Sequence, residues 1–528
     1  MEQLTHLYRW LFDSRSGEGK SLAPRWLFLR ALGAIYFSAF FSLAFQIKGL
    51  IGPSGVLPAW QYLAAVAHYL SASRYWSAPS LFWISAGPHM LMAVVWIGLL
   101  ASVLVFFNVW PRLNLFICFV CFLSFVAAAG DFSGYQSDGM LLEAGFLALF
   151  FAPPGLLPGF GADHPPSRAS LFLLLWEWFR IYFESGMVKI LSGDVQWRNL
   201  TAMDGYYQNS PLPTWIGWYV GHLPHWFQAA TTVLTLVLEF GIVLMVFFPR
   251  RVRLVCFWIV TPWQIGVILT GNYTFLNYLV AALGLLLLDD FSLRHLIPAR
   301  FRPRVPVEDV KAGPESAASL PERLRAVGVA VAAVLLTWVA YTTTVEMGAM
   351  VLSRVPLPLA PVKVLEPFRI ANQYGLFAVM TRGRYEIEFQ GSNDGTNWQP
   401  YLFRYKPQLL NEAPRIYAPY QPRFDWNLWF ASLGDWRQSQ IVLLTEERLL
   451  DNDSDVLNLF RSNPFPQSPP RYVRAVLWQY WFTSMDEKRR TGDWWRRQLL
   501  GLYAPTITRA ADGEPAAVQM PTELPPHD

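Results

Sequence analysis

The chain has 528 residues, of which 53% are hydrophobic and only 15% are charged. Its formal net charge of +4 is too small to indicate a nucleic-acid partner, and no basic stripe with interleaved aromatic residues is present. The mean hydropathy of +0.25, together with 24 Trp, 22 Tyr and 38 Phe, favours helices that meet lipid headgroups, where an amphipathic ring has both an apolar and a wet neighbour. Membrane lipids are therefore the first expected partner.

The N-terminal segment, residues 1–25, is polar, so we expect no cleavable signal peptide there; the segment fits the start of a retained signal-anchor helix better. A helix needs about twenty apolar residues to cross the hydrocarbon core. Windows of this kind predict about nine spans, of which the fourth is short and the fifth is amphipathic. The windows are 26–47, 84–107, 113–129, 139–152, 169–190, 229–248, 254–270, 272–288 and 326–344.

Positive charge is distributed unevenly between the predicted loops. With the N-terminus in the cytoplasm, the inner segments carry sixteen Lys and Arg residues, whereas the short outer loops carry only Lys48, Arg74 and Arg198. Because cytoplasmic loops are enriched in Lys and Arg, this asymmetry supports an odd number of crossings. Nine crossings place residues 345–528 outside the cytoplasm.

The predicted domain order follows from these spans. A helical bundle at 26–288 carries a long outer loop at 191–228 and is followed by an Arg- and Pro-rich cytoplasmic linker at 289–325. The last span, 326–344, leads to an extracytoplasmic domain at 345–509. The tail at 510–528 has no apolar run, so we expect it to be disordered. The expected fold class is an all-α polytopic membrane bundle followed by a β-rich domain.

The segment after the last span contains strand and turn patterns. Residues 385–389, 401–405 and 472–482 predict strands, and the SNDGTNW sequence at 392–398 predicts a hairpin turn, because Asn, Asp and Gly tolerate left-handed dihedral angles. Two helical stretches are expected at 439–450 and 453–461. The domain is therefore expected to be a small sandwich or sheet with helical insertions.

Large aromatic side chains concentrate in this domain around Trp426 and Trp429. One interpretation places them in the domain core or against the bundle, since Trp is usually largely buried. The other interpretation is an exposed patch that holds a client protein. The candidate client-binding residues are Arg423, Asp425, Trp426, Trp429 and Arg471.

Several polar residues fall inside or beside the predicted spans, where charge is costly and often marks a function. Glu177, Arg180 and Glu184 share one helix face, and their alternating signs suggest that they neutralise one another and lock helix to helix. By the predicted topology the remaining polar residues gather near the outer leaflet, where a polar cavity or simple interfacial wetting would explain them. These residues are Asp138, Glu143, Lys189, Asp194, Asp204, Asn272, Tyr273 and Asn277.

Seven sequence strings, in order along nearly the whole chain, resemble the lipase maturation factor family. They are LIGPSGVLP (50–58), SDGMLLEAGF (137–146), KILSGD with WRNLTAM (189–203), YQNSPLP (207–213), LTGNYTFLN (269–277), RFDWNLWF (423–430) and NPFP with PPRYVR (463–474). The resemblance implies an integral membrane protein whose C-terminal domain lies in the lumen of the endoplasmic reticulum and assists folding of secreted lipases. The low cysteine content is typical of a bacterial member, which would place this chain in the inner membrane with the domain in the periplasm.

A shorter run, YFESGMVK (182–189), is similar to the vitamin K-dependent γ-carboxylase family. In that family the matching lysine is a base, which implies Lys189 as the candidate catalytic residue. Nearby carboxylates such as Asp194 would oppose this role, because they favour the protonated amine.

Two functions follow from these observations. The first is a non-enzymatic chaperone or maturation factor that binds a secreted client, which the family resemblance suggests is a lipase. The second is an intramembrane enzyme that modifies a lipid-soluble substrate or a client side chain with Lys189 as base; transport has weaker support. No Ser-His-Asp arrangement, P-loop or dinucleotide motif is recognisable and the histidines lack metal-ligand spacing, so we expect no cofactor and no metal.

Overall fold

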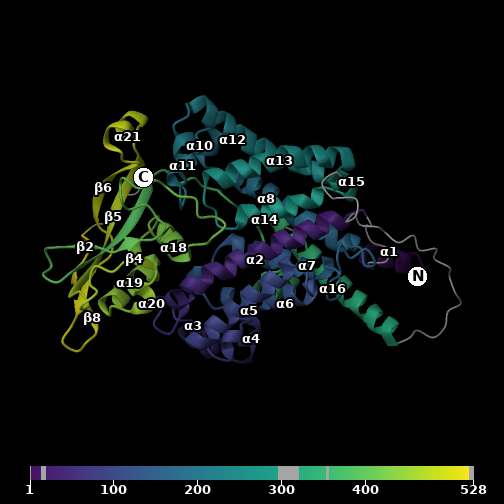
Figure 1. The fold of residues 1–528 in the computed structure, drawn as a ribbon, viewed down its shortest axis with the longest axis horizontal. Coiled ribbons are helices and arrows are strands. Elements are labelled where there is room, and N and C mark those ends of the chain that lie inside the picture. Colours follow the sequence, from purple (N-terminus) through teal and green to yellow (C-terminus); the bar gives the residue numbers. More distant parts are fainter. Residues whose placement is uncertain (1, 14–19, 295–319, 353–355, 523–528) are drawn as a thin grey trace.

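The computed structural model describes residues 2–13, 20–294, 320–352 and 356–522. It consists of a helical bundle, built mainly from the first two thirds of the chain, and a C-terminal α/β domain that docks on one end of it (Figure 1). The N-terminal helix α1 lies at the opposite end. We call these two ends the domain end and the N-terminal end of the bundle.

The bundle is centred on α2, a long apolar helix that packs along α5 and also meets α6, α7 and α14. The second layer forms around α8, which contacts α7, α12, α14 and α16. The helices of the bundle are α1 (Glu2–Phe12), α2 (Leu22–Ile51), α5 (Pro88–Phe106), α6 (Pro111–Val126), α7 (Gln136–Phe151), α8 (Arg168–Leu191), α12 (His225–Phe240), α13 (Arg250–Thr270), α14 (Leu276–Gly284) and α16 (Leu320–Val351).

In the described part of the chain, five helical segments are long and apolar enough to cross a membrane. They are Leu22–Ile51, Pro88–Phe106, His225–Phe247, Arg250–Thr270 and Arg325–Val351. The other predicted windows coincide with helices that are shorter, namely α6, α7 and α14, or more highly charged, namely α8. The structure therefore supports a mostly helical membrane-spanning part, with five candidate spans by length and composition.

Short helices close the domain end of the bundle. The segment after α2 forms an amphipathic helix whose exposed face carries aromatic side chains, and the segment after α8 folds back over the bundle instead of extending into solvent. These helices are α3 (Ala59–Leu70), α4 (Arg74–Ser77), α9 (Val195–Arg198), α10 (Ala202–Asn209) and α11 (Trp215–Gly221).

The N-terminal end is closed by α15 (Asp290–Leu293) and by the loop between α7 and α8. Asp290 accepts hydrogen bonds from the backbone N–H groups of Leu22 and Ala23 and so caps α2. Arg25 is fully buried and donates to the carbonyl groups of Phe160 and Gly161. Residues 295–319, which make up most of the predicted linker, lie outside the described residues.

The C-terminal domain contains a six-stranded antiparallel sheet with β1 and β5 at its centre. The helices α18, α19 and α20 lie between this sheet and the bundle (Figure 1). The strands are β1 (Arg384–Ser392), β2 (Gln399–Pro400), β5 (Tyr472–Phe482), β6 (Trp495–Leu502), β7 (Thr506–Arg509) and β8 (Pro515–Gln519), and a separate ladder joins β3 (Leu402–Phe403) to β4 (Phe460–Ser462). The helices are α17 (Ala360–Leu365), α18 (Arg423–Ala431), α19 (Gln440–Leu450), α20 (Ser454–Leu457) and α21 (Met485–Thr491).

The strand predictions at 385–389 and 472–482 are confirmed by β1 and β5, where alternate residues such as Ile387 and Leu477 enter the apolar core. The expected strand at 401–405 forms only the two-residue β3. The helix expected at 453–461 stops at Leu457, and β4 follows. The expectation of a disordered tail from residue 510 is wrong as far as residue 519, because β8 pairs with β7 through backbone hydrogen bonds that need no apolar run.

Candidate functional site at the junction of bundle and domain

Most of the polar residues singled out from the sequence lie at the domain end of the bundle and point inward. Asp138, Glu143, Glu177, Arg180 and Glu184 are all completely buried. Buried charges require partners, because the loss of hydration costs several kcal/mol per ion. Most of the partners found come from the C-terminal half of the chain, whereas both carboxylate oxygens of Glu177 have no hydrogen-bond partner among the described residues.

Arg423, the first residue of α18, forms a bidentate ion pair with Asp138 on α7. Its Nη1 and Nη2 atoms donate to the two carboxylate oxygens at 2.7 and 2.8 Å, and Nη1 also donates to the carbonyl of Phe132 at 2.7 Å. Both side chains of the pair are fully buried. The backbone N–H of Arg423 donates to Oε1 of Gln46 on α2. This one residue therefore fixes α18 to two helices of the bundle.

A second contact joins α7 and α8 to the segment before β1. Arg180 pairs with Glu143 across the two helices and donates to the carbonyl of Asn372 at 2.6 Å. The other carboxylate oxygen of Glu143 accepts from the Asn372 backbone N–H at 3.0 Å and from the Tyr374 hydroxyl at 2.8 Å. Glu184 accepts from the backbone N–H of Tyr374 at 2.6 Å. Residues 372–374 thus form hydrogen bonds with the charged face of α8 and its partner Glu143.

This arrangement corrects the expectation that Glu177, Arg180 and Glu184 neutralise one another along α8, but it agrees with the expectation that these charges lock helix to helix. The ion-pair partner of Arg180 is Glu143, which lies on a neighbouring helix, and Glu184 is satisfied by backbone. Pairs three or four residues apart on one helix stabilise it only weakly, whereas a pair between helices also fixes how they pack. The cluster is an interhelical contact extended by the C-terminal segment.

Lys189 near the end of α8 is also buried. Its Nζ donates to Oε1 of Glu239 at 2.8 Å and to the carbonyls of Ser185 and Leu376 at 3.2 and 3.1 Å. Three acceptors match the three hydrogens of an ammonium group, whereas a base needs a free lone pair. The geometry therefore favours a charged anchoring lysine and gives no support to Lys189 as a base.

Asn272 connects the start of α14 to the domain. Its Oδ1 accepts from the backbone N–H groups of Tyr417 and Ala418 at 2.6 and 3.0 Å, and its Nδ2 donates to the carbonyl of Arg415 at 2.8 Å. Tyr273 packs its ring against those of Tyr206, Phe377 and Trp426 in a separate aromatic cluster. Asn277 lies deeper in the bundle and accepts from Nε2 of Gln264 at 2.8 Å.

The two aspartates of the outer loop have different environments. Asp194 caps α9 and accepts from the backbone N–H of Met380 at 2.7 Å, so it also holds the segment that precedes β1. Asp204 lies at the surface, where its carboxylate is 3.0 Å from Nδ1 of His225. The predicted polar cluster is therefore not one cavity. It is a set of separate contacts, most of which hold the C-terminal half.

The aromatic patch of the domain is buried, as the first of the two interpretations expected. Trp426 and Trp429 are only 7% and 8% exposed, and Arg423 is not exposed at all. The assignment of these three residues to an exposed client-binding patch is therefore wrong, because all three are buried, and Arg423 and Trp426 contact Asp138, Tyr135 and Tyr273 of the bundle. Arg471 is exposed and stacks on Tyr472, so it is the one candidate of the five that a client could reach.

Asp425 is buried in the same helix and accepts from the backbone N–H groups of Tyr405 and Lys406, both at 3.1 Å. Burial in the domain raises the pKa of this carboxyl to about 6, because desolvation penalises the charged form more than the hydrogen bonds and Lys406 favour it. Asp425 is thus a structural acceptor for the 405–406 turn and not a binding residue.

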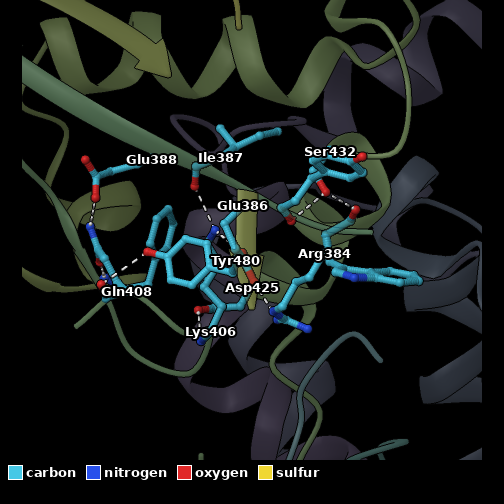
Figure 2. A network of polar contacts seen from close by, with 12 residues as sticks. Arg384, Glu386, Ile387, Glu388, Lys406, Gln408, Asp425, Ser432 and Tyr480 are labelled. Atoms are coloured by element: carbon cyan, nitrogen blue, oxygen red, sulfur yellow. Dashed lines mark hydrogen bonds and ion pairs between the residues drawn. The ribbon is translucent and has the colours of Figure 1, made fainter. Parts of the chain in front are cut away.

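Sequence reasoning missed a further buried network, shown in Figure 2. Arg384 on β1 donates to the carbonyls of Gln208 and Pro211 in the outer loop and pairs with Glu386. Lys406 donates to the other oxygen of Glu386 at 2.6 Å. The alternation of charged and apolar residues along 384–389 could have revealed a polar strand face that requires buried partners. Glu239 was missed too, although it is an acidic residue inside a predicted span.

Comparison with known proteins matches both halves of this architecture. The lipase maturation factor transmembrane domain matches residues 23–295, and the lipase maturation factor C-terminal domain matches residues 370–505. The chain belongs to the lipase maturation factor family. The family resemblance from the seven strings is thereby confirmed, and with it an integral membrane protein. The local likeness to the γ-carboxylase family gains no support.

Lipase maturation factor 2 of Gallus gallus is 31% identical over an alignment that covers 92% of this chain and 81% of that protein. Lipase maturation factor 1 of Bos taurus is 30% identical, with 94% and 93% covered, and that of Mus musculus is 29% identical, with 94% and 88% covered. No solved structure matches the chain at a significant level. The relatives therefore span both the bundle and the docked domain of this family member.

Proposed function

We propose that this chain is a membrane-embedded maturation factor that assists folding or assembly of secreted lipases. The names of its relatives supply the client class, and coverage of more than 90% of this chain includes both the bundle and the domain. The observation that carries the proposal is the fixed docking of the C-terminal domain through Arg423–Asp138 and the contacts of residues 372–374. A domain held in one orientation at the membrane can present a fixed surface to a client.

The proposed topology has nine crossings, with α6, α7, α8 and α14 in addition to the five longer segments. Arg25, Arg250 and Arg325 lie at the N-terminal end, opposite the domain, which agrees with the uneven distribution of Lys and Arg. The domain would then be extracytoplasmic, in a bacterial periplasm or in the lumen of the endoplasmic reticulum. A reporter fused after Pro361 should be active only outside the cytosol; activity in the cytosol would overturn this orientation.

The client-facing surface must be exposed, which excludes Trp426 and Trp429. We assign it to the edge of the sheet at β6, which among the described strands pairs only with β5. Unpaired N–H and C=O groups on an edge strand can bind an extended segment of another chain. Leu499 is 49% exposed on this strand, and exposed Arg496 lies beside it. A partly folded lipase, which still has unpaired strands, would fit this edge.

The experiment measures recovery of lipase activity when a urea-unfolded secreted lipase is diluted onto the full chain in lipid nanodiscs. The wild type should raise the yield and retain the lipase in a pull-down. Leu499→Lys should weaken retention by about fivefold or more, as expected when a charge replaces an apolar interface residue. The matched control is Val518→Lys, which changes a 54% exposed residue on β8 of the same sheet and should have no effect.

Each outcome decides one part of the proposal. If the wild type neither raises the yield nor retains lipase, the maturation function is wrong. If the wild type is active and Leu499→Lys behaves like Val518→Lys, the assignment to β6 is wrong while the function stands.

A further inference from the structure

A large cavity lies within the bundle beside Lys189. It is enclosed by α8, α12, α13 and α14, and its volume is about 620 Å³. Small-molecule sites in proteins range over about 300–1,000 Å³, so this cavity is large enough to hold a ligand. Residues of α10 and the segment around Phe377 cover it at the domain end.

The cavity opens sideways, towards the region that lipid occupies. Helix α12 packs on α8 and α10, and α13 packs on α11 and α14, while α12 and α13 hardly contact each other directly. The cavity is lined there by Trp226 and Leu234, which are 70% and 44% exposed, and by exposed Gly266. In a membrane, side chains exposed on these two helices face lipid tails. A hydrocarbon chain could therefore enter between α12 and α13.

The hydrogen bonds that Lys189 and Glu239 already make determine which kind of ligand group the cavity can bind. The three hydrogens of Lys189 already have acceptors, so no N–H of this residue is left for an anionic ligand. Oε2 of Glu239 is buried and has no hydrogen-bond partner in the described part of the chain. A buried carboxylate oxygen without a donor is unfavourable, and a ligand hydroxyl would satisfy it.

Three neighbouring polar side chains do not supply this donor. The Tyr182 hydroxyl donates to Oε1 of Gln264 at 2.7 Å, and Nε2 of Gln264 donates to Oδ1 of Asn277 at 2.8 Å. Thr235 donates to the carbonyl of Thr231 on its own helix. The hydrogens of these three groups are therefore committed within the protein, and Oε2 of Glu239 remains a free acceptor in the cavity.

We propose that this cavity binds a neutral lipid with a hydroxyl-bearing headgroup, of the monoacylglycerol class, whose hydroxyl donates to Oε2 of Glu239 and whose acyl chain lies between α12 and α13. The binding is non-covalent and requires no reaction at Lys189. It does not depend on the identity of the client, and it adds a lipid ligand to the proposed function.

The test uses the full chain in phosphatidylcholine nanodiscs and a monoacylglycerol that carries a photoreactive group on its acyl chain. Gly266→Phe should abolish most of the labelling, because a Cβ at this position meets no heavy atom within 4 Å and the ring can occupy the cavity. Gly328→Phe is the matched control: it places the same ring on α16, also at an exposed glycine with open space around it. It should label like the wild type.

Competition on the wild-type protein gives a second measurement that needs no variant. Unlabelled monoacylglycerol should displace the probe, and its dimethyl ether, which lacks hydroxyl donors, should compete about tenfold less well, as expected for the loss of a hydrogen bond to a buried carboxylate. Equal competition by the ether, stronger competition by phosphatidic acid, or equal labelling of folded Gly266→Phe and Gly328→Phe would each overturn the proposal.

Discussion

The two ends of the bundle differ in how far their ion pairs are exposed to solvent. At the N-terminal end, the side chains of the Arg325–Asp13 pair are 29% and 20% exposed. At the domain end, the Arg423–Asp138 and Arg180–Glu143 pairs are at most 1% exposed. Exposed pairs contribute little because water and salt screen them, whereas a buried charge is costly once its partner is lost. Positive charge at the N-terminal end thus serves to orient the chain in the membrane. At the domain end, specific buried ion pairs hold the C-terminal domain on the bundle.

The largest effect is expected from Arg423→Met, which leaves Asp138 buried without its partner. The free energy of unfolding should fall by about 3–5 kcal/mol, and the domain should become sensitive to limited proteolysis. The measurement is thermal or chemical unfolding of the full chain in detergent, with proteolysis at the junction in parallel. The double variant Arg423→Met/Asp138→Leu should recover most of the loss, because an apolar pair needs no compensation for burial. A single variant as stable as the wild type would contradict the docking role.

Asp425→Asn tests a buried charge that has no role in docking. The pKa of Asp425 is raised to about 6 in the folded domain from its ordinary value of 3.8, so the folded state binds the proton more tightly. The protonated Asp425 therefore stabilises the folded domain most below about pH 4, and about 3 kcal/mol of this stability is lost as the pH rises through about 6. The Asn variant keeps the acceptor for Tyr405 and Lys406 and should lack this decline. Melting temperatures between pH 4 and 7 measure it; parallel curves for both proteins would refute the shift.

Asp13→Asn should have the smallest effect, about 0–1 kcal/mol, because its pair with Arg325 is partly exposed. Unfolding at low and high salt provides the check, since any loss should shrink further as salt screens the charges. A loss as large as that of Arg423→Met would remove the difference between the two ends.

The sequence predicted elements well wherever local pattern and burial agree. The strand at 472–482 was found with its observed bounds because apolar residues recur every second position on the face that packs against α19. Residues 424–430 were recognised as aromatic-rich, but only the structure shows that they form one helix in which Trp426 and Trp429 are buried and Trp426 packs on the bundle. A short stretch of sequence does not show which other part of the chain packs on a given face of a helix.

The sequence identified the main residues of the candidate site but not which of them pair with one another. The sequence singled out Arg180, Glu143, Asp138 and Arg423 separately, yet the ion pairs join residues 37 and 285 positions apart in the chain. Helical spacing reveals only neighbours three or four positions away, so it suggested Glu177 and Glu184 as the partners of Arg180 instead. Backbone acceptors, such as those that Arg384 meets in the outer loop, have no sequence signature at all.

Helix α2, the first long helix of the bundle, ends against the C-terminal domain, which is synthesised last. Nε2 of Gln46 on α2 donates to the carbonyl of Gln421, and Gly49 lies so close to α20 that a Cβ would overlap the carbonyl oxygen of Asp455. A ribosome must therefore add 375 residues after Gln46 before the partner of this side chain exists. In a prematurely terminated chain, Gln46 and Gly49 stay uncovered at the membrane boundary. This exposure distinguishes unfinished molecules from finished ones.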